Sequence, residues 1–170
     1  MSLAGASMRS MTHEDMPLVR SWRNDWSVRQ YMNSTHEISE EEHANWFAQA
    51  SADQHCHLLI YEASQTPIGF VAVRVSESGG LGEWGFYKAP RSPCGTGRAM
   101  GLAALKFAFS EIGLYKLNGR VLAFNEKSVE FHAKLGFELE GTLRHDHFDG
   151  VEYHDVVCFG FFAKKWFARG

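Results

Sequence analysis

The stretch Pro90–Gly101, which reads PRSPCGTGRAMG, lies between an apolar run that ends at Tyr87 and a long helical run, Ala99–Phe109. Gly95 and Gly97 fall in its short polar turn, so the pattern predicts a strand, a glycine turn and the start of a helix. Proteins use this arrangement to present free backbone N–H groups to a phosphate. Glycine permits a positive φ and has no Cβ, so several amides can point into one concavity. The sequence therefore predicts an anion-binding turn.

Two familiar phosphate motifs do not fit this turn. A P-loop contains Gly-Lys-Ser/Thr and a dinucleotide fingerprint reads G-x-G-x-x-G, whereas Gly97 is followed by Arg98-Ala99-Met100-Gly101. A lone G-x-G before a helix also occurs as a plain helix entry. The ligand of the turn therefore depends on the rest of the chain.

The composition limits the class of protein. With 170 residues, of which 45% are hydrophobic and 14% aromatic, the chain fits one packed globular domain. The formal net charge of −3 argues against a general nucleic-acid or membrane-surface binder. No apolar run reaches membrane-spanning length and the N-terminus lacks a signal-peptide pattern, so we expect a cytoplasmic protein.

The cysteines and the N-terminus carry no motif. Cys56, Cys94 and Cys158 are widely spaced, which suits reduced thiols better than a disulfide framework or a zinc site. We interpret residues 1–7, MSLAGAS, as a leader or a disordered terminus and residues 8–166 as the domain.

Periodicity and turn residues predict a definite order of elements: a strand, two helices, three strands, a helix, a strand, a helix and a hairpin. The helix starts rest on Thr12 with Asp15, on Ser39 with Glu42 and on Asn125, and the hairpin rests on the Asp149-Gly150 turn. The predicted strands are 8–11, 57–61, 68–75, 81–87, 116–124, 137–148 and 151–162, and the helix after the glycine turn is 99–112. This order places the turn at the carboxyl end of a strand, where ligands bind in such units.

In this order, two motifs carry a family resemblance. Ser92-Pro93-Cys94-Gly95-Thr96-Gly97 is similar to the cofactor motif of the GNAT N-acetyltransferases, with Ser92 in place of their glutamine or arginine. Asn125, Ser128 and Lys134, followed by Leu135-Gly136-Phe137, resemble the second motif of that family. The resemblance implies an α/β (α+β) single-domain fold, with a mixed, mostly antiparallel sheet of about seven strands and four helices.

The resemblance also implies an enzyme that moves the acetyl group of acetyl-CoA to a primary amine, without a metal, and a possible homodimer. Backbone amides of the glycine turn would bind the pyrophosphate, helped by Arg91 or Arg98, and the pantetheine arm would pair with the strand of Phe86 and Tyr87. A backbone N–H there would polarise the thioester carbonyl. The expected cofactor contacts are Phe86, Tyr87, Arg91, Pro93, Cys94, Gly95, Thr96, Gly97, Arg98, Ala99, Asn125, Ser128, His132 and Lys134.

Further segments carry a narrower resemblance. Thr12–Asp15, Trp22–Asn24 and Phe148–Gly160 are similar to a narrower set within that family. The run Glu83–Tyr87, followed by GTGRAMG at 95–101 and FNEKSVEFHAKLGF at 124–137, resembles N-acetyltransferases of pseudaminic acid biosynthesis. Those enzymes acetylate the 4-amino group of a UDP-linked 4-amino-4,6-dideoxy sugar on the route to flagellin glycosylation. The same architecture also serves ribosomal-protein N-terminal acetyltransferases and other small-amine acetyltransferases. A non-enzymatic acetyl-CoA sensor is a further alternative.

Two residues are candidates for catalysis in such an enzyme. Glu83 is the expected general base, acting directly or through water, and the alternative is a structural acid in a strand-end salt bridge. His132 occupies the position where many GNAT enzymes carry a tyrosine that protonates the leaving thiolate. It is therefore expected either to act as the acid or only to contact the cofactor.

Aromatic and polar groups from both ends of the chain are candidates for the acceptor site. They can stack on a base or sugar, and Arg23 can meet a diphosphate. The expected acceptor contacts are Trp22, Arg23, Asn24, Tyr31, Trp46, His147, Tyr153 and His154. Alternation places His145 and His147 on one face of the hairpin, but no ligand spacing indicates a metal. Cys94 has no neighbouring base and is interpreted as a small turn residue.

Overall fold

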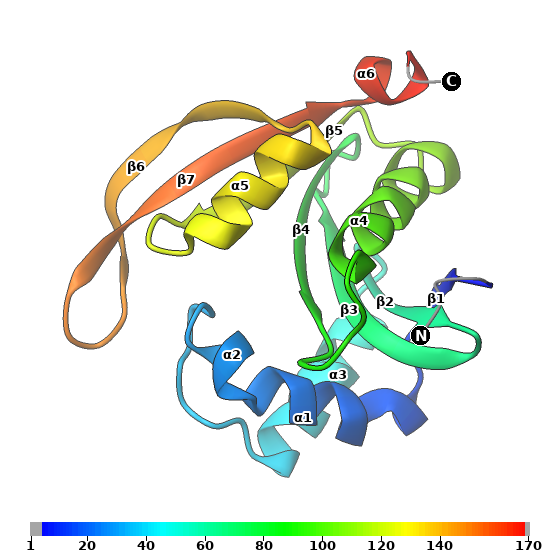
Figure 1. Cartoon of the computed structure of the whole chain (residues 1–170), viewed down its shortest axis with the longest axis vertical. Coiled ribbons are helices and arrows are strands. Elements are labelled where there is room, and N and C mark those ends of the chain that lie inside the picture. Colours follow the sequence, from blue (N-terminus) through cyan, green and yellow to red (C-terminus); the bar gives the residue numbers. More distant parts are fainter. Residues whose placement is uncertain (1–4, 169–170) are drawn as a thin grey trace.

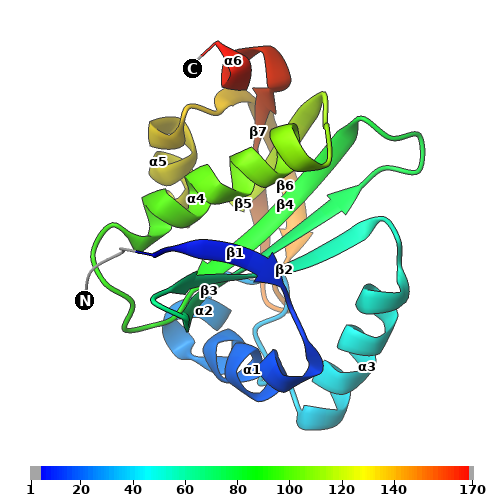
Figure 2. The same ribbon diagram turned by 90° about the vertical axis from the view of Figure 1, so that its right-hand side faces the viewer.

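The computed structural model describes residues 5–168 and shows one mixed sheet of seven strands in the order β1-β2-β3-β4-β5-β7-β6 (Figures 1 and 2). The strands are β1 (Ser7–Ser10), β2 (Cys56–Ala63), β3 (Thr66–Val75), β4 (Leu81–Lys88), β5 (Lys116–Leu122), β6 (Glu138–Phe148) and β7 (Tyr153–Phe162). The four longer helices are α1 (Met16–Asn24), α3 (Glu40–Ala52), α4 (Thr96–Lys106) and α5 (Glu126–Leu135). The predicted α/β (α+β) single domain and its order of elements are confirmed.

Several boundaries differ from the predicted ones. The helix after the glycine turn begins earlier, at Thr96, and its end widens into a π-helical segment, η2 (Phe107–Glu111). Two short helices were not predicted, α2 (Trp26–Arg29) and α6 (Ala163–Phe167), because four or five residues give too little periodicity. Of the predicted leader, Ser7 pairs with β2, while residues 1–4 lie outside the described residues. Within residues 5–168, no helix is long and apolar enough to cross a membrane.

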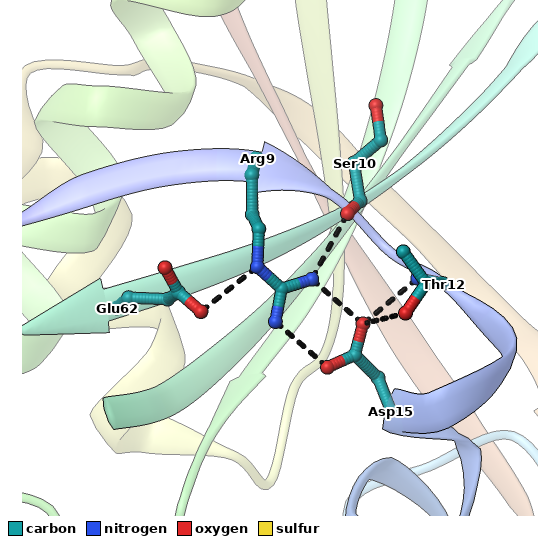
Figure 3. A network of polar contacts seen from close by, with 5 residues as sticks. All are labelled: Arg9, Ser10, Thr12, Asp15 and Glu62. Carbon is teal, nitrogen blue, oxygen red and sulfur yellow. Dashed lines mark hydrogen bonds and ion pairs between the residues drawn. The ribbon is translucent and has the colours of Figure 1, made fainter. Parts of the chain in front are cut away.

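A network of ion pairs fixes the entry of the chain into the sheet (Figure 3). Arg9 on β1 donates from Nη1 and Nη2 to the two carboxylate oxygens of Asp15, at 2.7 and 2.8 Å, and from Nε to Glu62 on β2, at 2.8 Å. Asp15 lies in a short 3-10 turn, η1 (His13–Asp15), and also accepts the N–H of Thr12, as the predicted capping box requires. The hydrogen bond from Arg9 lowers the pKa of the buried Asp15 carboxyl.

Alternate residues of the central strands point to opposite faces of the sheet and build two cores. Leu59 and Tyr61 pack on the side of α4 and α5, whereas Leu58 and Ile60 pack against α1 and α3. Figure 2 shows α4 above the strands and α1 and α3 below them. On β4 the same alternation places Trp84 on the α4 side. Its neighbours Glu83 and Gly85 therefore face the other way.

The hairpin of β6 and β7 ends the sheet and curves away from its centre (Figure 1). The predicted Asp149-Gly150 turn is present, with Gly150 at a φ of 102°. Strand pairing shifts between Leu143 and His147, and His145 between them has a φ of 53°. The prediction that His145 and His147 follow a regular alternation is therefore wrong, because a bulge interrupts the strand there.

Candidate active site

The glycine turn forms the start of α4. Gly95 is the N-cap in the left-handed region, with a φ of 86°, so the turn needs glycine at this position. The Thr96 N–H bonds to Pro93 O at 3.3 Å, which leaves the N–H groups of Gly97 and Arg98 free at the helix start. The Thr96 hydroxyl is fully buried and has no partner among the described residues. The turn therefore has the free donors that an anion requires.

Positive charge flanks this turn. Arg91 and Arg98 are exposed before and after it, and neither forms an ion pair within residues 5–168. Ser92, which stands in place of the usual glutamine or arginine, accepts a hydrogen bond from Lys88 Nζ at 3.2 Å. Cys94 is exposed and its thiol is free. The backbone amides and the two arginines together could hold a pyrophosphate.

The second motif shapes α5. The Asn125 side chain accepts the Ser128 N–H at 3.2 Å and caps the helix, and Gly136 ends it at a φ of 101°. Asn125 and Gly136 therefore fix the two ends of α5. Lys134 is exposed and pairs with Glu130 at 2.6 Å, so its predicted cofactor contact stays a prediction.

The strands β4 and β5 part in the middle of the sheet. They pair in parallel from Leu81 with Lys116 to Trp84 with Gly119 and then diverge. From Gly85 onward, β4 is paired with β3 alone, so the backbone groups on its other edge have no strand partner within the described chain. Phe86 and Tyr87 lie on this free edge. An extended ligand can hydrogen-bond to it as an added strand would.

His132 of α5 faces the point where the two strands part. Its Nδ1 lies 2.8 Å from Ser128 O, and since a carbonyl only accepts, Nδ1 carries the proton and Nε2 has a lone pair. Five aromatic rings surround the imidazole, and it is 2% exposed. Burial lowers the pKa of His132, and the hydrogen bond to Ser128 opposes this only in part. His132 is therefore neutral near pH 7.

Glu83 lies on the opposite face of β4. Its pairing partner on β5 is Asn118, and its pairing partner on β3 is Arg74. Arg74 pairs with Asp53 at 3.3 Å instead, and Glu83 forms no ion pair within residues 5–168. The expected alternative, a strand-end salt bridge, is absent there. Glu83 and Asn118 line an open concavity of about 500 Å³, which is the size of a small-molecule site.

The helices between β1 and β2, namely α1, α2 and α3, form the helical half of the molecule. This half contributes both packing and polar groups beside the face of Glu83. Trp22 is 6% exposed in the second core, and Trp46 packs on Phe70 there. Asn24 holds the backbone of Ile38 through two hydrogen bonds, at 2.9 and 2.8 Å. The sequence could not distinguish these structural roles from acceptor contacts, because the residue types suit both.

Two arginines of this half keep unpaired donors. Arg23 donates from Nη2 to Ser34 O at 2.7 Å, but its Nη1 is buried without a partner, as is Nε of Arg29, among the described residues. Burial lowers the pKa of Arg23, and the nearby charge of Arg29 adds to this effect. The half-buried Tyr87 side chain lies beside Arg23, and burial raises the pKa of its phenol. The predicted cofactor contact of Tyr87 stays a prediction.

An aromatic chain joins the helical half to the hairpin. Tyr31 contacts Phe124, with ring centroids 6.1 Å apart, and Phe124 contacts His154 at 4.7 Å. Sequence reasoning missed Phe124, although its place directly before Asn125 made it a candidate. Tyr153 is exposed and packs on Phe148 at 4.8 Å. The structure thus brings together two predicted acceptor residues, Tyr31 and His154, through a third ring.

The hairpin turn also gathers possible metal ligands. Oxygen or nitrogen atoms of Asp149, Glu152 and His154 lie within 4.8 Å of one another. Asp149 already accepts two turn N–H groups and pairs with His154 Nε2 at 2.6 Å. The hydrogen bonds of the turn account for this cluster. His147 Nε2 is buried nearby on β6 without a partner in residues 5–168.

The family model for the acetyltransferase (GNAT) domain matches residues 7–138. The chain belongs to the GNAT acetyltransferase family. It is accordingly an acyl-CoA-dependent N-acetyltransferase with acetyl-CoA as cosubstrate. The buried Thr96 hydroxyl, the free amides of the turn and the free edge of β4 fit that cosubstrate.

Several relatives of this GNAT protein are named for their activity. The SPbeta prophage-derived uncharacterized N-acetyltransferase YokL of Bacillus subtilis (strain 168) is 28% identical over 91% of this chain and 88% of its own. The spermidine N(1)-acetyltransferase of Escherichia coli (strain K12) is 26% identical, with 99% and 91% covered. None of these names indicates pseudaminic acid biosynthesis.

The fold is also that of a solved structure. Spermidine N-acetyltransferase from Vibrio cholerae, in complex with CoA and spermine, superposes with a TM-score of 0.87 at 22% identity, over 95% of this chain and 98% of that one. A dodecameric structure of the same enzyme has a TM-score of 0.80 at 22% identity, over 97% and 98%. At this identity the likeness shows the GNAT fold alone.

Proposed function

We propose that the protein acetylates the primary amine of a small acceptor that also carries a negative charge, and that the acceptor is a UDP-linked 4-amino-4,6-dideoxy sugar of the pseudaminic acid route. The observation that carries the amine part is the position of Glu83, exposed and unpaired on the open side of β4 where β4 and β5 part. A carboxylate there can take a proton from an ammonium group, directly or through water.

Two arginines support the proposed negative charge of the acceptor. Glu83, Gly85 and Tyr87 lie on one face of β4, and four residues of strand span about 13 Å. Arg23 lies beside Tyr87, at the far end of this row from Glu83. Buried guanidinium nitrogens without partners are costly unless an anion pairs with them. A diphosphate supplies such an anion, and Tyr31, Phe124 and His154 offer rings on which uracil can stack.

A polyamine is the second candidate acceptor, favoured by the relatives named as spermidine acetyltransferases. A polyamine carries only positive charge, so the arginine pair would repel it. Release of coenzyme A is measured with a UDP-linked 4-amino sugar, spermidine and ribosomal N-terminal peptides. We expect turnover with the sugar. Turnover with spermidine alone, or with peptides alone, contradicts the proposed acceptor, and no release with any amine indicates a sensor.

The variant Arg29→Gln tests the charge argument, since Arg29, unlike Arg23, has no backbone acceptor among its described contacts, and its carboxylate neighbour, the exposed Glu37, is 3.9 Å away. We expect kcat/KM for the sugar to fall about tenfold, as the loss of a charge-assisted hydrogen bond implies. The control is Arg20→Gln on α1, whose carboxylate neighbour Glu40 is 4.0 Å away. Equal losses in both variants would contradict the role of Arg29.

A homodimer is also proposed, from the resemblance alone. Light scattering of the purified protein tests it, and a monomer mass at micromolar concentration would contradict it.

A further inference from the structure

The indole nitrogen of Trp84 is a buried donor with no acceptor. Trp84 stacks on Phe137 with centroids 5.3 Å apart and is 5% exposed. Its Nε1–H has no hydrogen-bond partner within residues 5–168. An unsatisfied buried donor costs about 1–3 kcal/mol, so such a group requires an explanation.

An acceptor without a donor lies close to it. Because Nδ1–H of His132 is held by Ser128 O, the lone pair of the ring is on Nε2. No hydrogen bond to Nε2 is present in the described chain. Trp84 and His132 are in edge contact, with centroids 5.5 Å apart.

Gly119 explains how the two atoms come to face the same space. A Cβ on Gly119 would lie 2.6 Å from His132 Nε2 and 3.2 Å from Trp84 Nε1. Any side chain there would displace the histidine. Gly119 is also the β5 partner of Trp84 in the last pair before β4 and β5 diverge. The unpaired donor and acceptor therefore lie at the closed end of the gap between the two strands.

We propose that Trp84 Nε1–H and His132 Nε2 form a donor–acceptor pair that receives the sulfur atom of coenzyme A. The proposal rests on the proposed acetyl transfer, in which the thioester enters between β4 and β5. A thiol offers one weak donor, S–H, and one weak acceptor, S. The indole N–H matches the sulfur, and the imidazole lone pair matches the S–H.

The pair also accounts for the protons and electrons of the reaction. The amine nitrogen attacks the thioester carbon, the N–C bond forms, the C–S bond breaks and its electron pair goes to sulfur. Trp84 Nε1–H stabilises that charge. Glu83 has already removed the first proton, from the ammonium group. His132 starts neutral, takes the second proton, which the nitrogen loses as it becomes the amide, directly or through water, and gives it to the sulfur. Amide and thiol are the products, and His132 is neutral again.

This cycle differs from a mechanism in which His132 starts as the protonated imidazolium and acts as the acid. The groups in ring contact with His132 are aromatic, from β4, α5, β7 and Phe137, and no carboxylate is among them. An imidazolium would lie there without a counter-charge. Burial lowers the pKa of His132 accordingly. We therefore expect the rate to fall as the pH falls through that pKa, whereas an initial acid would lose activity as the pH rises.

Binding of coenzyme A and of desulfo-coenzyme A, measured by calorimetry, tests the pair apart from turnover. We expect the wild type to bind coenzyme A about five- to tenfold more tightly, as one or two net hydrogen bonds imply. Trp84→Phe and His132→Phe are each expected to reduce this ratio to about twofold or less. The matched control is Trp166→Phe, which removes an indole N–H from a distant bond to Ser110 and is expected to keep the ratio.

The outcomes separate the two proposals. If the wild type binds both ligands equally, or if both variants fold and keep the wild-type ratio, the donor–acceptor pair is wrong while coenzyme A binding stands. If the wild type binds neither ligand, the acetyl transfer itself is overturned, and the pair with it. Thermal unfolding shows that each variant is folded. The two substitutions are independent, so failure of one to fold leaves the other as the test.

Discussion

Two glycines of α4, Gly97 and Gly101, differ in how closely they approach α5, and this difference predicts opposite effects of alanine on stability. In Gly101→Ala, the new Cβ would lie 2.8 Å from Leu135 Cδ2 and 3.0 Å from Phe131 Cζ, both on α5. In Gly97→Ala, the nearest atom would be Phe131 Cε2 at an ordinary 3.7 Å. The same chemical change therefore meets a crowded contact at Gly101 and an ordinary van der Waals contact at Gly97.

The magnitudes follow from two opposing effects. Alanine favours a helix over glycine by about 0.5–1 kcal/mol, and this gain applies to both variants. Overpacking a core costs about 1–3 kcal/mol and applies only to Gly101→Ala. We expect Gly97→Ala to raise the free energy of unfolding by about 0.5 kcal/mol and Gly101→Ala to lower it by about 1 kcal/mol.

Urea denaturation followed by circular dichroism measures both variants against the wild type. Equal slopes with different midpoints would show a change of stability alone. The reasoning is refuted if Gly101→Ala is as stable as Gly97→Ala, because the close approach of α4 to α5 would then not exist.

Two further predictions concern the N-terminal half. Asp15→Asn removes the charged partner of Arg9 and is expected to cost about 1–3 kcal/mol at pH 7. Because the folded pKa of Asp15 is lowered, its contribution is complete above the unfolded pKa of about 3.9 and is lost as the pH falls through the folded value. Urea midpoints should therefore differ between wild type and variant at pH 7 and converge under acid; a constant difference would contradict this. Asn24→Ala loses both hydrogen bonds to the Ile38 backbone, so it is expected to speed proteolysis of residues 30–39 without changing kcat. An unchanged rate of proteolysis would contradict the structural role of Asn24.

Much of the fold could be predicted because its signals are local. The capping boxes at Thr12 and Ser39, the glycines 95 and 136 and the Asp149-Gly150 turn each fix one boundary through nearby backbone geometry. The short α2 could not be predicted, since four residues have no period. At the bulge, the backbone N–H of His145 donates to the side-chain carboxylate of Asp155, ten residues away on the partner strand.

The site was predictable only to the level of residue types. The sequence identified His132, but its protonation depends on the rings around it and on the Ser128 carbonyl. Trp84 was read as part of an apolar run, because nothing in the sequence shows that its nitrogen is unpaired. Trp22 and Asn24 suit a pocket as well as a core, and only three-dimensional contacts decide between these roles.

The central claim is that the amine is deprotonated on the open face of β4, at Glu83. The most direct test compares Glu83→Gln with Glu111→Gln, an exposed glutamate of η2 far from the site in sequence, through kcat and acetyl-CoA affinity between about pH 6 and 9. We predict that Glu83→Gln lowers kcat by about 10²-fold or more while acetyl-CoA affinity stays near wild type, and that Glu111→Gln changes neither. Unchanged turnover of Glu83→Gln across this pH range would contradict the account.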